Sequence, residues 1–360
     1  MVMIESIALD DLVQRHGSWL ETGIDEGPVI SSRVRLARNL DAYHFPSWAP
    51  ENQKHAIWNQ SHALFSNTEK PYMCWEMGTI PEIDREILFE RHLISQELAN
   101  KESDSGVFVS TDEMMSIMIN EEDHIRIQAL KPGLNVKDAW ESASAIDDEL
   151  EQILTYAYNA RLGYLTSCPS NVGTGLRASV MLHLPGLVLL EEMDPVVNGI
   201  SKIGLAVRGM WGEGTEAVGN MFQISNQITL GKDETQIVNH LEQIVLELVE
   251  HELNARQRLM NEKQLIIEDH ISRSFGLLSH AKLMASGEAL NLLSTLRLGI
   301  DLNLITGMSR QEMDQLFIST QPAHLQKIEG NELDPNERDI VRAEMLRNFM
   351  KHANLNIEQE

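Results

Sequence analysis

The chain has 360 residues, a length that accommodates two domains and a substantial core. Its 42% hydrophobic and 23% charged residues are typical of a soluble globular protein, and no apolar run reaches the roughly 18 residues of a membrane helix. The formal net charge of −25 argues against nonspecific nucleic-acid binding, which needs a basic surface. It suits basic protein partners, or it serves solubility alone.

The N-terminal segment and the cysteines indicate a cytoplasmic protein. The opening residues MVMIESIALDDLVQ carry acidic side chains, whereas an export signal carries basic ones followed by an uninterrupted apolar run. The two cysteines, Cys74 and Cys168, stand far apart and form no CxxC pair. A disulfide framework or a zinc site is therefore not expected, and a reducing compartment is the default.

The spacing of apolar residues along the sequence changes near residue 235. Before it, short β-like runs alternate with helices and turns, and after it the apolar residues recur at helical spacing. We place the boundary after one long helix, so that residues 1–255 form the first domain and residues 256–360 a small all-α domain. Neighbouring strands joined by short turns predict an α+β fold whose antiparallel sheet has one polar face and helices on the other.

Arginines recur on the polar side of the predicted strands. In SSRVRLA, Arg33 and Arg35 share one face and alternate with apolar residues. Later runs place further arginines in or at the end of a strand: Arg126, Arg177 and Arg208. Guanidinium groups on one face repel each other unless an anion lies between them, and they bind phosphate oxygens in pairs. The pattern favours a triphosphate site; the alternative is a set of separate surface arginines, each paired with a nearby acid.

Acidic residues and one cysteine flank the same strands. The run Glu121–Asp123 joins two β segments, and Glu213 follows in the turn RGMWGEG. Clustered carboxylates hold Mg²⁺ through water or deprotonate a cationic acceptor, although a solvated turn is the commoner fate of such a run. Cys168 opens the loop CPSNVGTG, whose glycines admit a ligand close to the backbone. A lone cysteine is more often a small core residue, so both interpretations stay open.

Familiar nucleotide and metal motifs are absent. There is no GxxxxGK[ST], and no HRD or DFG pair of a protein kinase. Gly212, Gly214 and Ala217 fit G-x-G-x-x-A, but a loop and a strand follow where a dinucleotide site needs a helix. His251 and Glu252 begin an HExxH motif without its second histidine, so no zinc site is expected.

Four segments together resemble the phosphagen (guanidino) kinase family: SSRVRLARN, NEEDHIRIQ, CPSNVGTGLRASV and RGMWGEGTEAVGNMFQISNQITLG. They follow the family's order, and the resemblance implies an antiparallel α+β fold and transfer of a phosphoryl group from ATP, with Mg²⁺, to a guanidinium nitrogen. It assigns nucleotide binding to Arg33, Arg35, His124, Arg126, Arg177 and Arg208, and catalysis to Glu122, Glu213 and Cys168. No direct metal ligand is implied; support of Mg²⁺ falls to Glu121 and Asp123.

Three departures from the small-molecule kinases indicate one branch of the family. Those enzymes carry a helical domain before the segment that here begins at Ser31, and they lack the helical extension at the C-terminus. Met181 stands where they have a histidine that contacts adenine, so the base contacts stay open. The first two departures resemble, over essentially the whole chain, the bacterial branch that phosphorylates arginine side chains of proteins.

This branch implies a set of partners and a regulatory motif. The partners are protein substrates with exposed arginines marked for Clp-type proteolysis in stress, a McsA-like activator, a Clp-type unfoldase or protease, and a second copy in a homodimer. Neither nucleic acid nor membrane is implied. The segment NERDIVRAEMLR carries an RDxxRA motif at Arg338, Asp339 and Arg342, which in this branch recognises phosphoarginine at an allosteric site. The alternative is an exposed helix with an i,i+3 pair that contributes roughly a few tenths of a kcal/mol.

Two other functions share much of this pattern. A kinase for free arginine or another small guanidine needs the same chemistry, but small acceptors need enclosure, and the missing N-terminal lid counts against it. A protease adaptor that only reads phosphoarginine would not need two carboxylates and five phosphate arginines.

Overall fold

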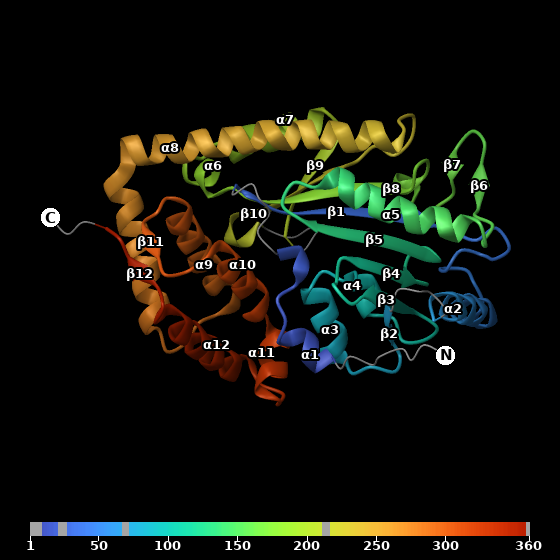
Figure 1. Ribbon diagram of the computed structural model, residues 1–360, viewed down its shortest axis with the longest axis horizontal. Helices are drawn as coiled ribbons and strands as arrows, with labels where there is room; N and C mark the ends of the chain where they lie inside the picture. Colours follow the sequence, from blue (N-terminus) through green and yellow to red (C-terminus); the bar gives the residue numbers. More distant parts are fainter. Residues whose placement is uncertain (1–8, 21–26, 67–71, 211–216, 358–360) are drawn as a thin grey trace. The chain divides into compact units, whose positions relative to one another are not determined.

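The structure is a computed structural model that describes residues 9–20, 27–66, 72–210 and 217–357 (Figure 1). Contacts divide the chain into two compact units, which are described separately. Unit 1 comprises residues 1–19, 31–180 and 225–243. Unit 2 comprises residues 20–30, 181–224 and 244–360.

The strands form one large sheet and two small hairpins. The large sheet has the order β2-β3-β4-β5-β1-β8-β10-β9. Its strands are β1 (Val29–Arg38), β2 (Tyr72–Glu76), β3 (Gly106–Ser110), β4 (Met115–Ile119), β5 (Ile125–Pro132), β8 (Leu176–His183), β9 (Leu205–Gly209) and β10 (Met221–Asn226). The hairpins pair β6 (Tyr158–Asn159) with β7 (Gly163–Tyr164), and β11 (Ile305–Thr306) with β12 (Asn354–Leu355).

Helices supply the rest of the regular structure. The α-helices are α1 (Leu9–Val13), α2 (Glu51–Phe65), α3 (Glu82–Glu90), α4 (Gln96–Ala99), α5 (Val136–Glu151), α6 (Pro185–Leu189), α7 (Met193–Lys202), α8 (Glu234–His280), α9 (Ser286–Asp301), α10 (Arg310–Ser319), α11 (Pro322–Glu329) and α12 (Pro335–Met350). Three short 3-10 turns are η1 (Ser18–Leu20), η2 (Pro169–Asn171) and η3 (Val218–Asn220).

Antiparallel pairing organises unit 1, as the sequence predicts. β2 pairs with β3, β3 with β4, β4 with β5, and β5 with β1, each time antiparallel. Val34 and Leu36 on β1 are fully buried, whereas the alternating Arg33 and Arg35 are only partly buried. The predicted α+β class, with an antiparallel sheet and a helical C-terminal region, is confirmed.

Helix α5 is joined to β1 by a buried ion pair. Arg38 donates from Nε and Nη2 to the carboxylate of Asp147, the shortest contact being 2.6 Å, and both side chains are almost fully buried. The Arg38 guanidinium also lies over the ring of Tyr164, 3.6 Å from its centroid. Ala139 and Ala143 complete the buried face of α5. Small residues there let the helix approach the sheet closely, and the ion pair fixes its position along β1.

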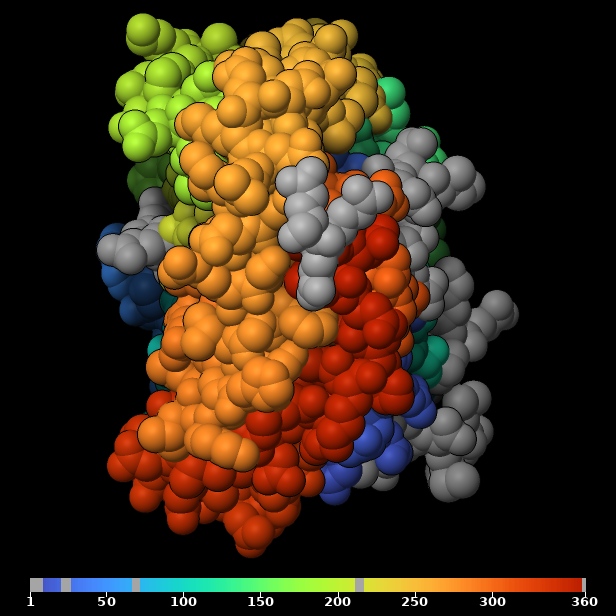
Figure 2. Space-filling view, turned by 90° about the vertical axis from the view of Figure 1, so that its left-hand side faces the viewer, coloured from blue at the N-terminus to red at the C-terminus, as the bar shows by residue number. Residues whose placement is uncertain are grey.

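The C-terminal region of unit 2 is helical, as its period predicts. Helix α8 bends at Lys263, where φ is −137° and ψ is 29°. Helices α10 and α12 begin with capping boxes in which Ser309 and Asp334 accept from the third helical NH and the Glu there accepts in return. Figure 2 shows the later part of α8 lying beside the C-terminal segment on one face of this unit. The boundary expected near residue 255 stays a prediction, because α8 runs through it.

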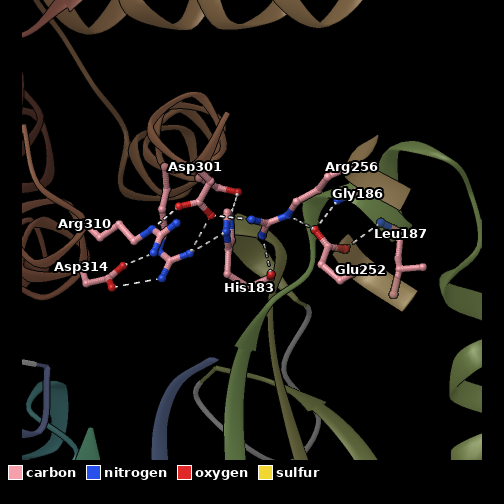
Figure 3. Close-up of polar contacts among 10 residues, drawn as sticks. His183, Gly186, Leu187, Glu252, Arg256, Asp301, Arg310 and Asp314 are labelled. Atoms are coloured by element: carbon pink, nitrogen blue, oxygen red, sulfur yellow. Dashed lines mark hydrogen bonds and ion pairs between the residues drawn. The ribbon is translucent and has the colours of Figure 1, made fainter. Parts of the chain in front are cut away.

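A chain of buried charges holds unit 2 together (Figure 3). Glu252 on α8 accepts hydrogen bonds from the NH groups of Gly186 and Leu187, both at 2.9 Å. Arg256, one turn later, donates to Glu252 at 2.6 Å and to Asp301 at 2.5 Å. The carboxylate of Glu252 therefore caps the first turn of α6 while its partner arginine reaches α9.

The same chain of charges extends to α10 and the end of β8. Asp301 also binds Arg310, and Arg297 donates to Asp314 at 2.6 Å. Arg297 Nη1 lies 3.1 Å from Nδ1 of His183, whose Nε2 lies 2.8 Å from the Ser294 hydroxyl. Since Arg297 only donates, His183 Nδ1 accepts and its proton sits on Nε2. Burial, followed by Arg297 and Arg256, lowers the pKa of His183, so this ring is neutral.

Within the described ranges, no helix is both long and apolar enough to cross a membrane.

Candidate active site

Three neighbouring strands bring four of the predicted arginines into one region of unit 1. β5, β1 and β8 are adjacent in the sheet and carry Arg126, then Arg33 and Arg35, then Arg177. In the β1–β5 register Ala37 lies opposite Arg126, so Arg35 is its diagonal neighbour on the same face. Arg177 donates from Nη2 to the Ser225 hydroxyl at 3.4 Å.

Burial, together with repulsion among these arginines, changes their acidity. Burial, and then the charges of Arg177 and Arg126, lower the pKa of Arg33 to about 10. Burial lowers the pKa of Arg35 too, helped by Arg33 first among its charged neighbours. The Nε of Arg35 has no hydrogen-bond partner in the described part of the chain. An anion with several oxygens, such as a polyphosphate, would offset this repulsion and use several donors at once.

Arg126 differs because carboxylates surround it. Its Nη1 donates to Glu121 at 2.5 Å and its Nη2 to Glu122 at 2.8 Å. Burial alone would lower the pKa of Arg126, but the charges of Glu121, Asp123 and Glu122 outweigh it and raise that pKa. Glu121 is fully buried and also accepts from the Ser95 hydroxyl at 2.5 Å. Arg126 therefore joins the cationic side of the region to its acidic side.

Glu122 is the accessible carboxylate of this acidic turn. Its side chain is 31% exposed, whereas those of Glu121 and Asp123 are buried. Burial raises the pKa of Glu122, Arg126 opposes the shift, and the charges of Asp123, Glu121 and Glu97 add to it. A carboxylate with a raised pKa accepts a proton more readily. The sequence expectation that Glu122 acts as a base agrees with this environment, and its catalytic role stays a prediction.

The turn itself is held by Asn120, whose backbone is left-handed with φ of 54°. Its side-chain amide donates to the carbonyls of Lys54 and Asp104, and its NH donates to the carbonyl of His124. Asparagine adopts this conformation at low cost because its side chain bonds locally. The acidic residues that follow are thereby fixed between the end of β4 and the beginning of β5.

The loop that carries Cys168 lies close to the same strands in unit 1. A Cβ at Gly173, where φ is +116°, would lie 2.2 Å from the carbonyl of Thr229, and one at Gly175 would lie 2.6 Å from the carbonyl of Ala37. Neither position tolerates a side chain. The Thr229 hydroxyl donates to the carbonyls of Ser170 and Val172. The glycines thus serve close backbone packing here. Cys168 itself is partly buried, with its sulfur 3.0 Å from the Ser170 hydroxyl.

His124 has a position that the resemblance did not anticipate. Its Nδ1 accepts from the NH of Leu40 at 3.0 Å, and its Nε2 lies 2.8 Å from the carbonyl of His44. The ring is fully buried, with Tyr43 and Phe45 edge-on beside it. Both ring nitrogens are used by the main chain, and the nucleotide contact expected of His124 stays a prediction. This geometry assigns the ring to holding the segment after β1.

Two predicted residues cannot be joined to this region. Glu213 lies outside the described residues. Arg208 lies on β9 in unit 2, and its place relative to the other four arginines stays a prediction.

The C-terminal motif on α12 is only partly accessible. Arg342 is 1% exposed and donates to the carbonyls of Thr320 and Met284, both at 2.8 Å. It also donates to Asp339 at 2.6 Å, whose side chain is 33% exposed. Arg338 is partly buried and donates to the carbonyl of Leu333. Arg342 therefore joins α12 to the end of α10 and to the loop between α8 and α9, and it orients Asp339. Arg338 and Asp339 are the more accessible members of the motif.

Sequence reasoning missed the residues that support the site. Asn39, Ser95 and Ser225 contact Asp123, Glu121 and Arg177 respectively. Two of them stood inside the recognised segments SSRVRLARN and MFQISNQITL without an assigned role. Ser225 has the parity of a polar-face residue, which is a usable signal. Ser95 is the N-cap of α4 and accepts from the NH of Leu98, but its contact to Glu121 spans 26 residues of sequence, so only the fold reveals its part in the site.

Comparison with known proteins gives two family matches. The ATP:guanido phosphotransferase C-terminal catalytic domain matches residues 55–255. The protein-arginine kinase McsB C-terminal domain matches residues 264–360.

Curated relatives match along nearly the whole chain. A protein named protein-arginine kinase from Halothermothrix orenii is 46% identical over 346 residues, 95% of this chain and 99% of that one. A protein of the same name from Bacillus subtilis is 44% identical over 344 residues, 94% of each chain.

Solved structures of similar fold include kinases of small guanidino compounds. Lombricine kinase aligns with a TM-score of 0.57 and 25% identity over 71% of this chain and 72% of that one. The duplicated taurocyamine kinase of Schistosoma mansoni, with bound transition state analog components, aligns with a TM-score of 0.58 and 25% identity. That alignment covers 72% of this chain and 39% of the duplicated chain.

Proposed function

The chain belongs to the ATP:guanido phosphotransferase family and is a phosphotransferase, and we propose that its acceptor is the arginine side chain of a protein. The C-terminal match to the protein-arginine kinase domain and the names of the full-length relatives support this acceptor. The observation that carries the chemistry is the junction at Arg126, where a cluster of arginines meets the carboxylate of Glu122.

Each side of this junction has its own task. The arginines Arg33, Arg35 and Arg177 hold the phosphates of ATP and offset negative charge on the transferred group. Glu122 grips the acceptor guanidinium, whose pKa above about 12 makes it a poor nucleophile, and takes one of its protons. The freed nitrogen forms a bond to the γ-phosphorus as the bond from that phosphorus to the ADP oxygen breaks. The proton stays on Glu122, and ADP leaves with the bond's electron pair.

Mg²⁺ accompanies ATP in this proposal without a ligand set made of protein carboxylates. Among the described residues, no group of three or more His, Cys, Asp or Glu is arranged to hold a metal ion. Glu121 is already bound to Arg126 and Ser95. These residues fit a magnesium ion held by phosphate oxygens and water, a mode this ion commonly adopts. When bound, the ion neutralises charge on the phosphates.

Further assignments follow from the resemblance and belong to the same proposal. Glu213 is the second carboxylate on the acceptor, Arg208 a fifth phosphate ligand, and Cys168 a third contact to the guanidinium. Arg338 and Asp339 read phosphoarginine on α12, with Arg342 holding Asp339 in place. Marking of substrates for a Clp-type protease, a McsA-like activator and a homodimer complete the proposed setting.

Incubation with Mg-ATP and an unstructured protein acceptor, followed by mass spectrometry at neutral pH, tests this function. The neutral pH is necessary because the P–N bond of phosphoarginine is acid-labile. We expect phosphate on protein arginines, and at least about a hundredfold slower transfer by the Glu122→Gln variant. Phosphate on free arginine alone would indicate a small-molecule kinase. Absence of transfer to either acceptor, with and without an activator, would remove it.

A further inference from the structure

The carboxylate of Asp123 is buried away from the solvent that Glu122 reaches. Asp123 is 0% exposed and follows Glu122 directly. Its Oδ1 accepts from the side-chain amide of Asn39 at 2.6 Å and from the NH of Ser167 at 2.7 Å. Its Oδ2 is buried without a hydrogen-bond partner in the described part of the chain. This arrangement gives the side chain contacts to the protein interior, and the Mg²⁺ support that the resemblance implied stays a prediction.

These contacts join two segments that the proposed chemistry uses. Ser167 immediately precedes Cys168, and Asp123 immediately follows Glu122. One hydrogen bond to a buried carboxylate therefore connects the backbone beside the proposed base to the backbone beside the thiol. The Asn39 amide reinforces the connection, because it also donates to the carbonyl of Leu165 and its oxygen accepts from the NH of His124.

The loop is held from its other side by different residues. The Thr166 hydroxyl donates to the carbonyl of Cys168 at 2.7 Å, and Thr229 bonds the carbonyls of Ser170 and Val172. Among these bonds, only the contact to Asp123 joins the beginning of the loop to the acidic turn. Burying a carboxylate with one unpaired oxygen is costly. A charged acceptor makes shorter and stronger hydrogen bonds than a neutral one, so the contacts of 2.6 and 2.7 Å to Asp123 form a firm link.

We infer that Asp123 is a positioning residue that fixes the Cys168 loop against the Glu122 turn, so that the two groups meet the same acceptor guanidinium. Asp123 touches neither ATP nor acceptor in this role; it acts through the Ser167 peptide. The inference rests on the proposed function, because it assigns both Glu122 and Cys168 to the acceptor. The structural part of the inference, that Asp123 links the Cys168 loop to the Glu122 turn, does not depend on any enzymatic activity.

The test compares Asp123→Ala with Asp123→Asn, which keeps a side-chain oxygen for the Ser167 NH. Hydrogen–deuterium exchange of peptides that contain Ser167 measures the link, and steady-state kinetics with an arginine-containing protein measures its consequence. Ser167→Ala is the matched control, since it keeps the NH and removes a hydroxyl that has no partner in the described residues. Ser32→Ala controls for general stability, because it loses one buried and one partly buried hydrogen bond elsewhere in unit 1.

We expect Asp123→Ala to accelerate exchange at Ser167 at least tenfold and to lower kcat/KM for the acceptor about a hundredfold, the scale of a small misplacement of reacting groups. The KM for ATP should stay within about threefold, since the arginines are untouched. Asp123→Asn should bring both the exchange rate at Ser167 and kcat/KM most of the way back to the wild-type values. The two serine controls should resemble the wild type.

Equal loss of ATP and acceptor affinity in Asp123→Ala would overturn the inference, as would unchanged exchange at Ser167. If Asp123→Asn shows normal exchange at Ser167 but low activity, the negative charge of Asp123 matters and the position of the loop does not. That result would also overturn the inference. If the wild-type chain transfers no phosphate to arginine, the proposed function is wrong. The exchange measurement then still decides whether Asp123 holds the loop. Only the catalytic role assigned to that link would be withdrawn.

Discussion

The Oε2 atom of Glu122 accepts a hydrogen bond from Nη2 of Arg126 at 2.8 Å, four residues later in the chain. This contact joins a proposed acceptor-binding carboxylate to a proposed phosphate-binding arginine. In the proposed function it links the acceptor site to the phosphate site through a single pair of side chains, one on the acidic turn and one on β5.

Replacing the proposed base separates chemistry from nucleotide binding. In Glu122→Gln an amide oxygen still accepts from Arg126, but the side chain no longer takes a proton. We expect kcat to fall about 10²- to 10⁴-fold, the range for loss of general-base catalysis, while the dissociation constant of Mg-ATP changes little. Initial rates and calorimetric ATP titration measure the two quantities. A loss of ATP affinity as the main defect would contradict the assigned role.

The acid limb of the pH–rate profile should report the raised pKa of Glu122. The base works only when deprotonated, so kcat/KM falls as pH falls through that pKa. The fall should therefore begin at a higher pH than for an ordinary glutamate with a pKa of about 4.3. Glu97 adds to the upward shift, so Glu97→Gln should move the limb to lower pH without changing the plateau. A limb that does not move would assign the titration to another group.

Removing one charge from the arginine cluster should weaken ATP binding and stabilise the protein without ATP. Burial and its neighbours lower the pKa of Arg33 to about 10, so at pH 7 the charged form is disfavoured in the folded state relative to the unfolded one. That penalty would fade only as pH rises from about 10 towards the unfolded value. Arg33→Met keeps much of the volume and removes the charge.

We expect Arg33→Met to bind ATP roughly tenfold to a hundredfold more weakly, since hydrogen bonds to charged groups contribute about 1.5–3 kcal/mol. Without ATP its Tm should rise by roughly 2–4 °C for each kcal/mol of repulsion relieved. Thermal melts with and without Mg-ATP check both statements. A lower Tm with unchanged ATP affinity would mean that Arg33 is a structural arginine.

The two arginines of the α12 motif should behave differently. Arg342→Met leaves the carbonyls of Thr320 and Met284 without their buried donor, which costs about 1–3 kcal/mol for each. Arg338→Ala loses one contact, to the Leu333 carbonyl, and should change stability by at most about 1 kcal/mol. Urea unfolding measures both. In the proposed setting, Arg338→Ala is sufficient to abolish the response to added phosphoarginine, and the variant stays folded. A normal response would mean that the motif has a structural role.

Much of this architecture was accessible from the sequence because it is local. Alternation around Val34 and Leu36 predicts β1, and the parity of Arg33 and Arg35 predicts a shared face. The helical period after residue 235 predicts α8 and its successors. Such patterns arise within one element, where neighbouring residues determine the outcome.

The supporting contacts were not accessible, because they join residues far apart in sequence. His124 has the appearance of a ligand in the segment NEEDHIRIQ, yet the chain folds back so that Leu40 and His44 occupy both of its nitrogens. The partner of Asp123 lies at Ser167 for the same reason. A side chain's identity indicates what it can bind, whereas the tertiary path of the chain decides what it does bind.

The charged chain in unit 2 gives a prediction for stability. Glu252 is fully buried and accepts from two backbone NH groups and from Arg256. Glu252→Gln leaves part of this set unpaired and should cost about 3–5 kcal/mol, the scale for breaking a buried ion pair. The exposed neighbour Glu250 is the control, and Glu250→Gln should stay within about 0.5 kcal/mol. Equal stability of the two variants would contradict the importance given to this cluster.

The same cluster makes the helical C-terminus depend on the rest of unit 2. Its acids and bases come from β8, α8, α9 and α10, so the charges balance only when residues before and after the middle of α8 are present together. A chain truncated near Arg256 would keep Glu252 and lose Asp301. Removing the helices that follow would therefore leave Arg256 with one of its two carboxylate partners.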